Sequence, residues 1–139
     1  WVAAIEEFRA SSLTLAGMDI TNHAIVDFVT DELTRIEDLD VAVDLRKASP
    51  TYGKWESVEL NHENKWMYWI PPGFAHGFVV LSETADFLYK TTDYYAPEYE
   101  RCITWNDPQL NIDWHNNAPP SLSEKDKQGL LMCNAEVFE

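Results

Sequence analysis

The histidine with the most suggestive surroundings is His76, which ends the run Pro71-Pro72-Gly73-Phe74-Ala75-His76. Glycine permits a tight turn at the end of a strand, so a histidine that follows the turn would point into the interior of a β-barrel. An imidazole in such a place can bind a metal ion, contact a polar ligand or transfer a proton near neutral pH. A histidine after a turn can equally be a structural residue, and this pattern alone leaves both interpretations open.

The spacing Pro-x-Gly-x-x-His resembles the second conserved motif of the cupins. Metal-binding cupins also carry a His-x-His pair and a glutamate upstream, which supply imidazole and carboxylate ligands for a divalent ion. The other histidines of this chain are His23, His62 and His115, and none lies in such a cluster. The fourth position after His76, often Asn in that motif, is Val80. We therefore expect no metal site, which also disfavours a metal-dependent cupin dioxygenase or isomerase.

The elements that must position these residues follow a period of two after residue 39. Large apolar residues alternate with Asp and Ala through residues 39–45, which predicts a half-buried strand. Further short strands are expected about every ten residues, between turns rich in Gly, Pro and Asn; they cover residues 55–60, 66–70, 78–81 and 85–90. Ser123-Glu124-Lys125-Asp126 predicts the capped start of a short helix that Gly129 ends. The strand spacing predicts an antiparallel sandwich, barrel or jelly roll.

The first 39 residues follow a different pattern. Apolar residues recur at helical spacing over residues 25–36, which predicts an amphipathic helix, and residues 3–16 predict a second, weaker one. The expected organisation is therefore a divergent, helical leader over residues 1–39, followed by a β domain over residues 40–139.

Charge and composition exclude several classes of function. The 139 residues include 24 Asp and Glu against 10 Lys and Arg, a formal net charge of −14. Such acidity argues against a protein that binds nucleic acid by neutralising phosphates, and against docking on an anionic membrane. No apolar run approaches the ~18 residues of a membrane-spanning helix. The two cysteines, Cys102 and Cys133, form no metal-type pair, and we expect them to be reduced thiols in a cytoplasmic protein.

Six blocks of sequence after residue 39 resemble the dTDP-4-dehydrorhamnose 3,5-epimerase family, in the family's order and spacing. The blocks span residues 40–47, 49–55, 63–65, 69–78, 87–95 and 122–126. The resemblance implies an all-β, cupin-type jelly roll that acts as a homodimer without metal or organic cofactor. It also implies inversion of C3 and C5 of dTDP-4-dehydro-6-deoxyglucose, in dTDP-L-rhamnose biosynthesis. In such a reaction a base removes a proton next to the C4 ketone, an enolate forms, and an acid returns a proton to the opposite face.

The resemblance also assigns roles to individual residues. Tyr89 matches the general acid, although a tyrosine in an alternating strand can also be a core-facing aromatic. Asp126 matches the carboxylate that orients the family's catalytic histidine and raises its basicity. Four residues match substrate contacts: His76, the thymine-stacking Tyr95, Glu100 and Lys125.

The resemblance begins only at Asp40. Residues 1–39 contain neither the Arg-Gly-x-His motif that carries the family's base nor its Gly-Lys pair. His23 is a candidate replacement for the base, but its Thr-Asn-His-Ala context favours a capping or solvent-facing role. Two functional interpretations stay open: an epimerase, and a catalytically impaired jelly-roll module that binds a thymidine-nucleotide sugar. A third interpretation treats residues 1–39 as a frame-shifted or recombined leader on a truncated gene.

Overall fold

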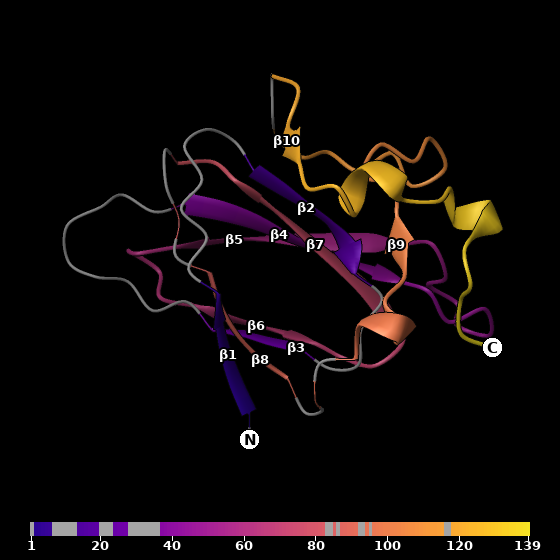
Figure 1. The fold of residues 1–139 in the computed structure, drawn as a ribbon, viewed down its shortest axis with the longest axis horizontal. Helices are drawn as coiled ribbons and strands as arrows, with labels where there is room; N and C mark the ends of the chain where they lie inside the picture. The colour runs from indigo at the N-terminus through magenta and orange to yellow at the C-terminus, as the bar shows by residue number, and fades with distance from the viewer. Residues whose placement is uncertain are drawn as a thin grey trace.

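The computed structural model describes residues 2–6, 14–19, 24–27, 37–82, 85, 87–91, 94, 96–115 and 118–139. These parts form ten strands and three short 3-10 turns (Figure 1). The strands are β1 (Val2–Glu6), β2 (Thr14–Asp19), β3 (Ala24–Asp27), β4 (Glu37–Asp44), β5 (Trp55–Asn61), β6 (Met67–Ile70), β7 (Phe74–Val80), β8 (Phe87–Thr91), β9 (Cys102–Ile103) and β10 (Ser121–Leu122). The 3-10 turns are η1 (Pro97–Tyr99), η2 (Asp126–Gln128) and η3 (Met132–Asn134).

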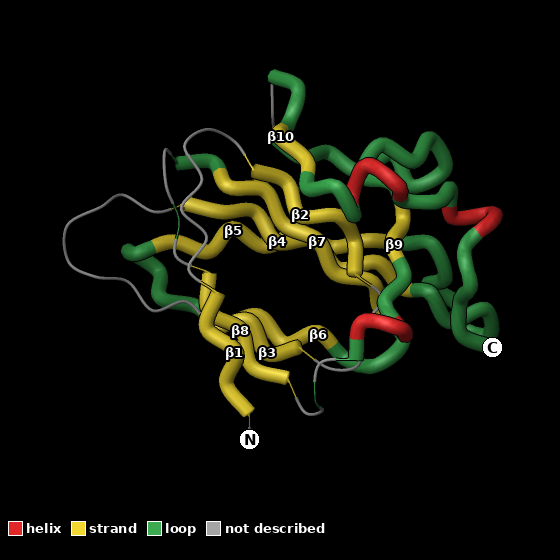
Figure 2. Tube along the Cα trace, viewed as in Figure 1, coloured by secondary structure: helices red, strands yellow, loops and turns green. Residues whose placement is uncertain are grey.

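The strands form two sheets that face each other (Figure 2). The four-stranded sheet has the order β1-β8-β3-β6, and the six-stranded sheet has the order β10-β2-β7-β4-β5, with β9 also paired to β2. Every pairing among these strands is antiparallel except that of β10 with β2. The prediction of an all-β, antiparallel jelly roll is confirmed, and β4 to β8 lie close to the strands expected from the alternating pattern.

The helices expected within residues 1–39 are wrong, because the described parts of this segment are strands β1, β2 and β3 and the start of β4. In β3, Ile25 pairs with Trp69 of β6 on one side and with Lys90 of β8 on the other. A helix here would leave the edges of β6 and β8 without hydrogen-bond partners, a liability for any sheet. Local helical spacing is a weak preference, and pairing with distant strands outweighs it here. Residues 28–36 lie outside the described residues.

Strand β4 is buried on both faces, so the expectation of a half-buried strand is also wrong. On its outer face, Leu39, Val41 and Val43 pack against the C-terminal segment, which contributes Ile103 and Met132. On its inner face, which looks toward the four-stranded sheet, the acidic residues are buried as completely as the apolar ones. Because both faces of the six-stranded sheet are covered, the alternation of apolar and acidic residues does not alternate core with solvent.

The short helix expected after Ser123 is only a 3-10 turn, although Ser123 still binds the start of that turn and Gly129 follows it. The backbone N–H of Asp126 donates to Ser123 Oγ at 3.1 Å, and Gly129 follows the turn η2. Within the described residues, no helix has the length and apolar character needed to span a bilayer.

Candidate functional site

His76 and Asp40 form a buried pair on the inner face of the six-stranded sheet. Gly73 makes the preceding turn with a φ of +88°, and β7 then carries His76 in register with Ala42 of β4. His76 Nε2 lies 2.6 Å from Asp40 Oδ1, and the two side chains are 12% and 0% exposed. A carboxylate at this distance fixes the orientation of the imidazole.

Two tyrosines of the four-stranded sheet face the same interior. Tyr68 and Tyr89 pack against an inner apolar cluster, which is formed by Leu60, Phe78, Val80 and Ala85. The ring of Phe78 stacks on His76 with a centroid separation of 6.4 Å. Through this cluster, Tyr89 and His76 border one interior space from opposite sheets. Burial, reinforced by the charges of Asp40 and Glu56, raises the pKa of Tyr68 to about 12, so this phenol keeps its proton.

Asp126 lies beside Cys102 of β9, which is two strands away from His76 in the six-stranded sheet. Its carboxylate is 4% exposed and accepts hydrogen bonds from Ser123 Oγ at 2.6 Å and from the Cys102 thiol at 3.9 Å. Cys102 is in register with Asp19 on β2, and Asp19 is in register with His76 on β7. Since adjacent strands are about 4.8 Å apart, this row separates Cys102 from His76 by roughly 10 Å.

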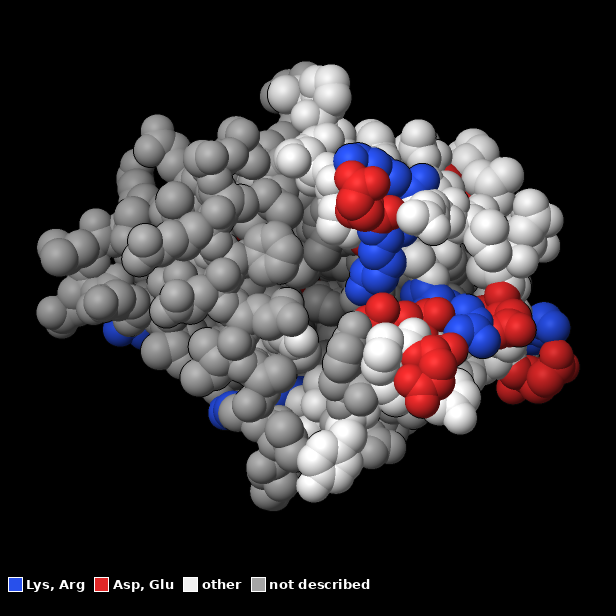
Figure 3. Space-filling view, viewed as in Figure 1, with Lys and Arg blue, Asp and Glu red and all other residues white. Residues whose placement is uncertain are grey.

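Glu100 and Lys125 form an ion pair next to Asp126. Lys125 Nζ lies 3.7 Å from Glu100 Oε1, and the side chains are 41% and 20% exposed. In Figure 3, basic and acidic side chains lie side by side over the part of the molecule that carries the C-terminal segment. Further pairs in the C-terminal segment join Arg101 to Glu136, Lys127 to Glu124 and Lys47 to Glu139.

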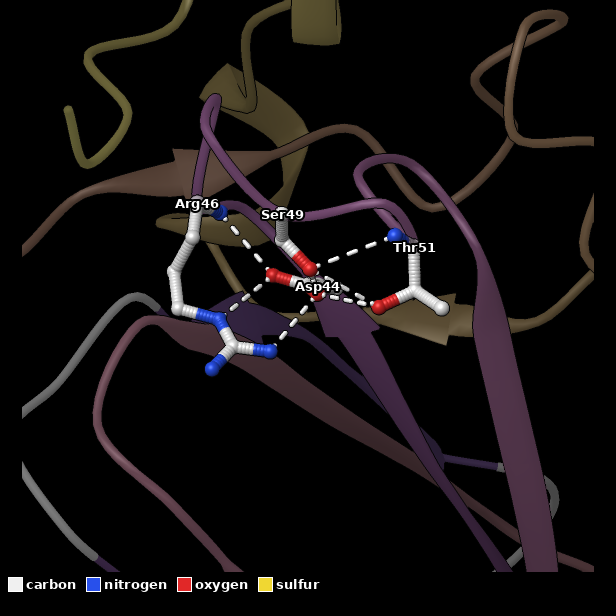
Figure 4. A network of polar contacts seen from close by, with 4 residues as sticks. All are labelled: Asp44, Arg46, Ser49 and Thr51. Atoms are coloured by element: carbon white, nitrogen blue, oxygen red, sulfur yellow. Dashed lines mark hydrogen bonds and ion pairs between the residues drawn. The ribbon is translucent and has the colours of Figure 1, made fainter.

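A second polar cluster lies at the other end of β4, where Asp44 is 1% exposed (Figure 4). Its carboxylate accepts hydrogen bonds from Arg46 Nε and Nη2 at 2.9 and 2.8 Å, from Ser49 Oγ at 2.5 Å and from Thr51 Oγ1 at 2.6 Å. The Arg46 guanidinium also lies 4.7 Å above the ring of Phe74. These bonds, above all those from Arg46, hold the pKa of Asp44 well below its usual range. The cluster fixes the turn that follows β4.

The structure thus brings the expected site residues into two groups. His76 and Tyr89 border the interior between the sheets, whereas Glu100, Lys125 and Asp126 lie together beside β9. Tyr95 and His23 lie outside the described residues. Among the side chains that the structure describes, no group of three or more His, Cys, Asp or Glu residues could hold a metal ion.

Sequence reasoning missed three residues of the interior: Asp38, Asp40 and Tyr68. Asp38 and Asp40 carry the signal that could have identified them, because they occupy alternate positions of a strand and therefore share one face. That face is buried, and an acidic residue on a buried face is unusual unless it has a partner or a function.

The family comparison covers most of the chain. The family model described as dTDP-4-dehydrorhamnose 3,5-epimerase matches residues 9–134. The match therefore begins at residue 9, whereas the blocks of resemblance begin at residue 40. The expectation that residues 1–39 fall outside the family is corrected for residues 9–39.

Curated relatives match over a shorter region. The dTDP-4-dehydrorhamnose 3,5-epimerase of Pseudomonas aeruginosa is 63% identical over 102 residues, which are 73% of this chain and 56% of that protein. The enzyme of the same name from Salmonella typhimurium is 53% identical over 103 residues, 74% of this chain and 56% of the relative. The chain thus spans about half the length of these relatives.

Solved structures agree with the family match. The dTDP-6-deoxy-D-glucose-3,5-epimerase RmlC from Legionella pneumophila, solved in complex with dTDP-4-keto-L-rhamnose, has a TM-score of 0.84 and 42% identity. That comparison covers 96% of this chain and 70% of the Legionella chain. Sequence, family model and backbone agree, and the chain belongs to the dTDP-4-dehydrorhamnose 3,5-epimerase family.

Proposed function

We propose that this chain is a sugar-nucleotide epimerase that inverts C3 and C5 of dTDP-4-dehydro-6-deoxyglucose, a step of dTDP-L-rhamnose biosynthesis. The observation that carries the proposal is the family match over residues 9–134, in a fold whose interior is bordered by His76 and Tyr89. The Legionella neighbour, bound to dTDP-4-keto-L-rhamnose, supports a nucleotide sugar as the ligand class.

The chemistry requires a base, an acid and a way to stabilise an enolate. The C4 ketone acidifies the hydrogens on C3 and C5, so a base of moderate strength can remove each in turn. Tyr89 is the proposed general acid, because a phenol can return a proton to the opposite face of the enolate. Asp126 is the proposed counterpart of the carboxylate that orients the family's catalytic histidine; residues 1–39 carry no Arg-Gly-x-His motif, so no residue of this chain is proposed as that base. His76, held by Asp40, contacts the sugar from the sheet opposite Tyr89.

The remaining proposed contacts concern the nucleotide. Tyr95 stacks on the thymine ring, and Glu100 and Lys125 form further substrate contacts. The partly exposed ammonium of Lys125, which pairs with Glu100, has the charge that suits a diphosphate. The proposed protein is a cytoplasmic homodimer that needs neither a metal nor an organic cofactor.

The test is proton exchange with the solvent. The chain is incubated with dTDP-4-dehydro-6-deoxyglucose in D₂O, and deuterium at C3 and C5 is followed by NMR and mass spectrometry. We expect deuterium at both carbons. We also expect the rate in Tyr89→Phe to fall by about 10²–10⁴-fold, the usual contribution of a general acid. Tyr99→Phe is the matched control, since Tyr99 is 72% exposed and outside the interior.

Two results would contradict the proposal. If the wild-type chain incorporates no deuterium above a protein-free sample, it is not an epimerase for this substrate. If Tyr89→Phe and Tyr99→Phe exchange at equal rates, Tyr89 is not the acid.

A further inference from the structure

Asp38 is a buried acid without a visible partner. Its side chain is 0% exposed, and neither carboxylate oxygen has a hydrogen-bond partner in the part of the chain that the structure describes. Asp40 Oδ2 is also buried and without a partner there, whereas Asp40 Oδ1 is held by His76. An interior acid of this kind requires a physical account, because buried polar groups are almost always hydrogen-bonded.

The surroundings of Asp38 are apolar. Asp38 lies in register with Leu60 of β5 and Val80 of β7, and both belong to the inner apolar cluster. Two positions along the same strand, Asp40 lies in register with Val58 and Phe78. Alternate residues of a strand share a face and are about 7 Å apart. The two carboxyl groups therefore enter one low-dielectric space.

Two carboxylates cannot both be ionised there at moderate cost. Burial of one unpaired charge already costs several kcal/mol, and a second charge of the same sign adds repulsion. Only Asp40 has an imidazole at hydrogen-bond distance, so the negative charge is favoured on Asp40. The proton is then favoured on Asp38.

We infer that Asp38 and Asp40 together carry one negative charge at neutral pH, with the proton on Asp38, so that the charge stays on Asp40 beside the imidazole of His76. Any effect of this proton on catalysis rests on the proposed function. The retention of the proton on Asp38 does not depend on that function.

The electrostatics of the interior agree with this geometry. Burial, followed by the charge of Asp40, raises the pKa of Asp38 to about 8. Burial also raises the pKa of Asp40, against a lowering by the hydrogen bond to His76. The titratable groups that the described elements bring to this space are Asp40 of β4, His76 of β7, Tyr68 of β6 and Tyr89 of β8, with Glu56 farther along β5.

The direct test follows the His76 imidazole by NMR as the pH is raised, in the wild type and in Asp38→Asn. The neutral amide keeps the shape of Asp38 but has no proton to lose. We expect the His76 ring signals to shift near pH 8 in the wild type, as the Asp38 proton leaves, and this shift to be absent in Asp38→Asn. The same response of the His76 signals near pH 8 in both proteins would overturn the inference. Asp113→Asn is the control, because the Asp113 side chain is 74% exposed and pairs only loosely with His115, at 4.0 Å.

A second measurement does not depend on any activity. The pKa of Asp38 is higher in the folded protein than in the unfolded chain, so this group lowers stability as the pH rises from about 4 to about 8. Relative to Asp38→Asn, the unfolding constant of the wild type should rise by up to tenfold per pH unit in that range. The wild type compared with Asp38→Val should give the same slope with pH, even if Asp38→Val and Asp38→Asn differ in absolute stability. A difference that is constant with pH would contradict the inference.

Discussion

The two ends of β4 bury the same residue type in opposite surroundings. Asp44, at the C-terminal end, is 1% exposed and accepts hydrogen bonds from three side chains. Asp38, at the N-terminal end, is 0% exposed and has no partner among the described residues. The pKa of Asp44 is lowered and that of Asp38 is raised, the first chiefly by the bonds from Arg46 and the second by burial.

The difference shows how one strand can serve two purposes. A carboxylate whose bonds are satisfied stabilises the fold, and here it fixes the turn after β4. A carboxyl group without partners lowers stability, and such groups are kept where their proton or charge has a use. On this interpretation the Asp44 end is structural, whereas the Asp38 end, with Asp40 and His76, belongs to the site.

The largest effect should come from His76 at the site end. His76→Asn removes the imidazole that faces the interior and holds Asp40, and we expect the rate of deuterium incorporation to fall by about 10²-fold or more. Steady-state assays on the folded variant, checked by circular dichroism, measure this. His115→Asn serves as the control on an exposed histidine. An unchanged rate in His76→Asn would contradict the assignment of His76 and the Asp38 end of β4 to the site.

Asp44→Asn should mainly change stability. The substitution removes the charge that Arg46, Ser49 and Thr51 share, and we expect the free energy of unfolding to fall by about 2–4 kcal/mol. Urea unfolding at pH 7 measures the loss. The deuterium assay on the same variant, run well below its unfolding temperature, should give nearly the wild-type rate. A large loss of rate with little loss of stability would reverse the division between the two ends.

Asp38→Val should raise the free energy of unfolding, whereas Asp44→Asn lowers it. It replaces a carboxyl group that has no partner among the described residues by an apolar side chain suited to a strand, and we expect the protein to gain about 2–4 kcal/mol at pH 7. The same urea titration measures the gain, which should be larger at pH 8 than at pH 5. A loss of stability at all these pH values would mean that Asp38 makes a favourable interaction.

Arg46→Lys should have the smallest effect. Lysine keeps the charge but loses the two-pronged contact with Asp44 and the planar stacking on Phe74, and we expect a loss of about 1 kcal/mol. Thermal unfolding compares it with Lys54→Arg as a matched surface change. A loss as large as that of Asp44→Asn would show that the guanidinium alone carries the cluster.

The sequence predicts the second half of the fold well because its signals are local. Alternation, Gly-Pro turns and the Ser123–Asp126 capping pattern act over a few residues, and β5, β6 and β8 lie close to where they are expected. Strands β1 to β3 are different. Their state depends on pairing with β6, β7 and β8 far along the chain, and no local pattern records such pairing.

The site could be predicted only in part for a similar reason. His76 stands out through its turn, and the family resemblance proposes roles for Tyr89 and Asp126. The partnership of His76 with Asp40 depends on the register of β4 against β7, which sequence spacing does not give. The burial of Asp38 depends in addition on the four-stranded sheet, which covers the inner face of β4.

The contrast between Asp38, which holds its proton at one end of β4, and Asp44, which is ionised at the other end, can be measured directly. In protein labelled with ¹³C at the aspartate carboxyl carbons, the signals of Asp38 and Asp44 are followed together from pH 4 to pH 9. We expect Asp44 to remain ionised over the whole range and Asp38 to lose its proton only near pH 8. Loss of the Asp38 proton near pH 4, the ordinary value for an aspartate, would contradict the account.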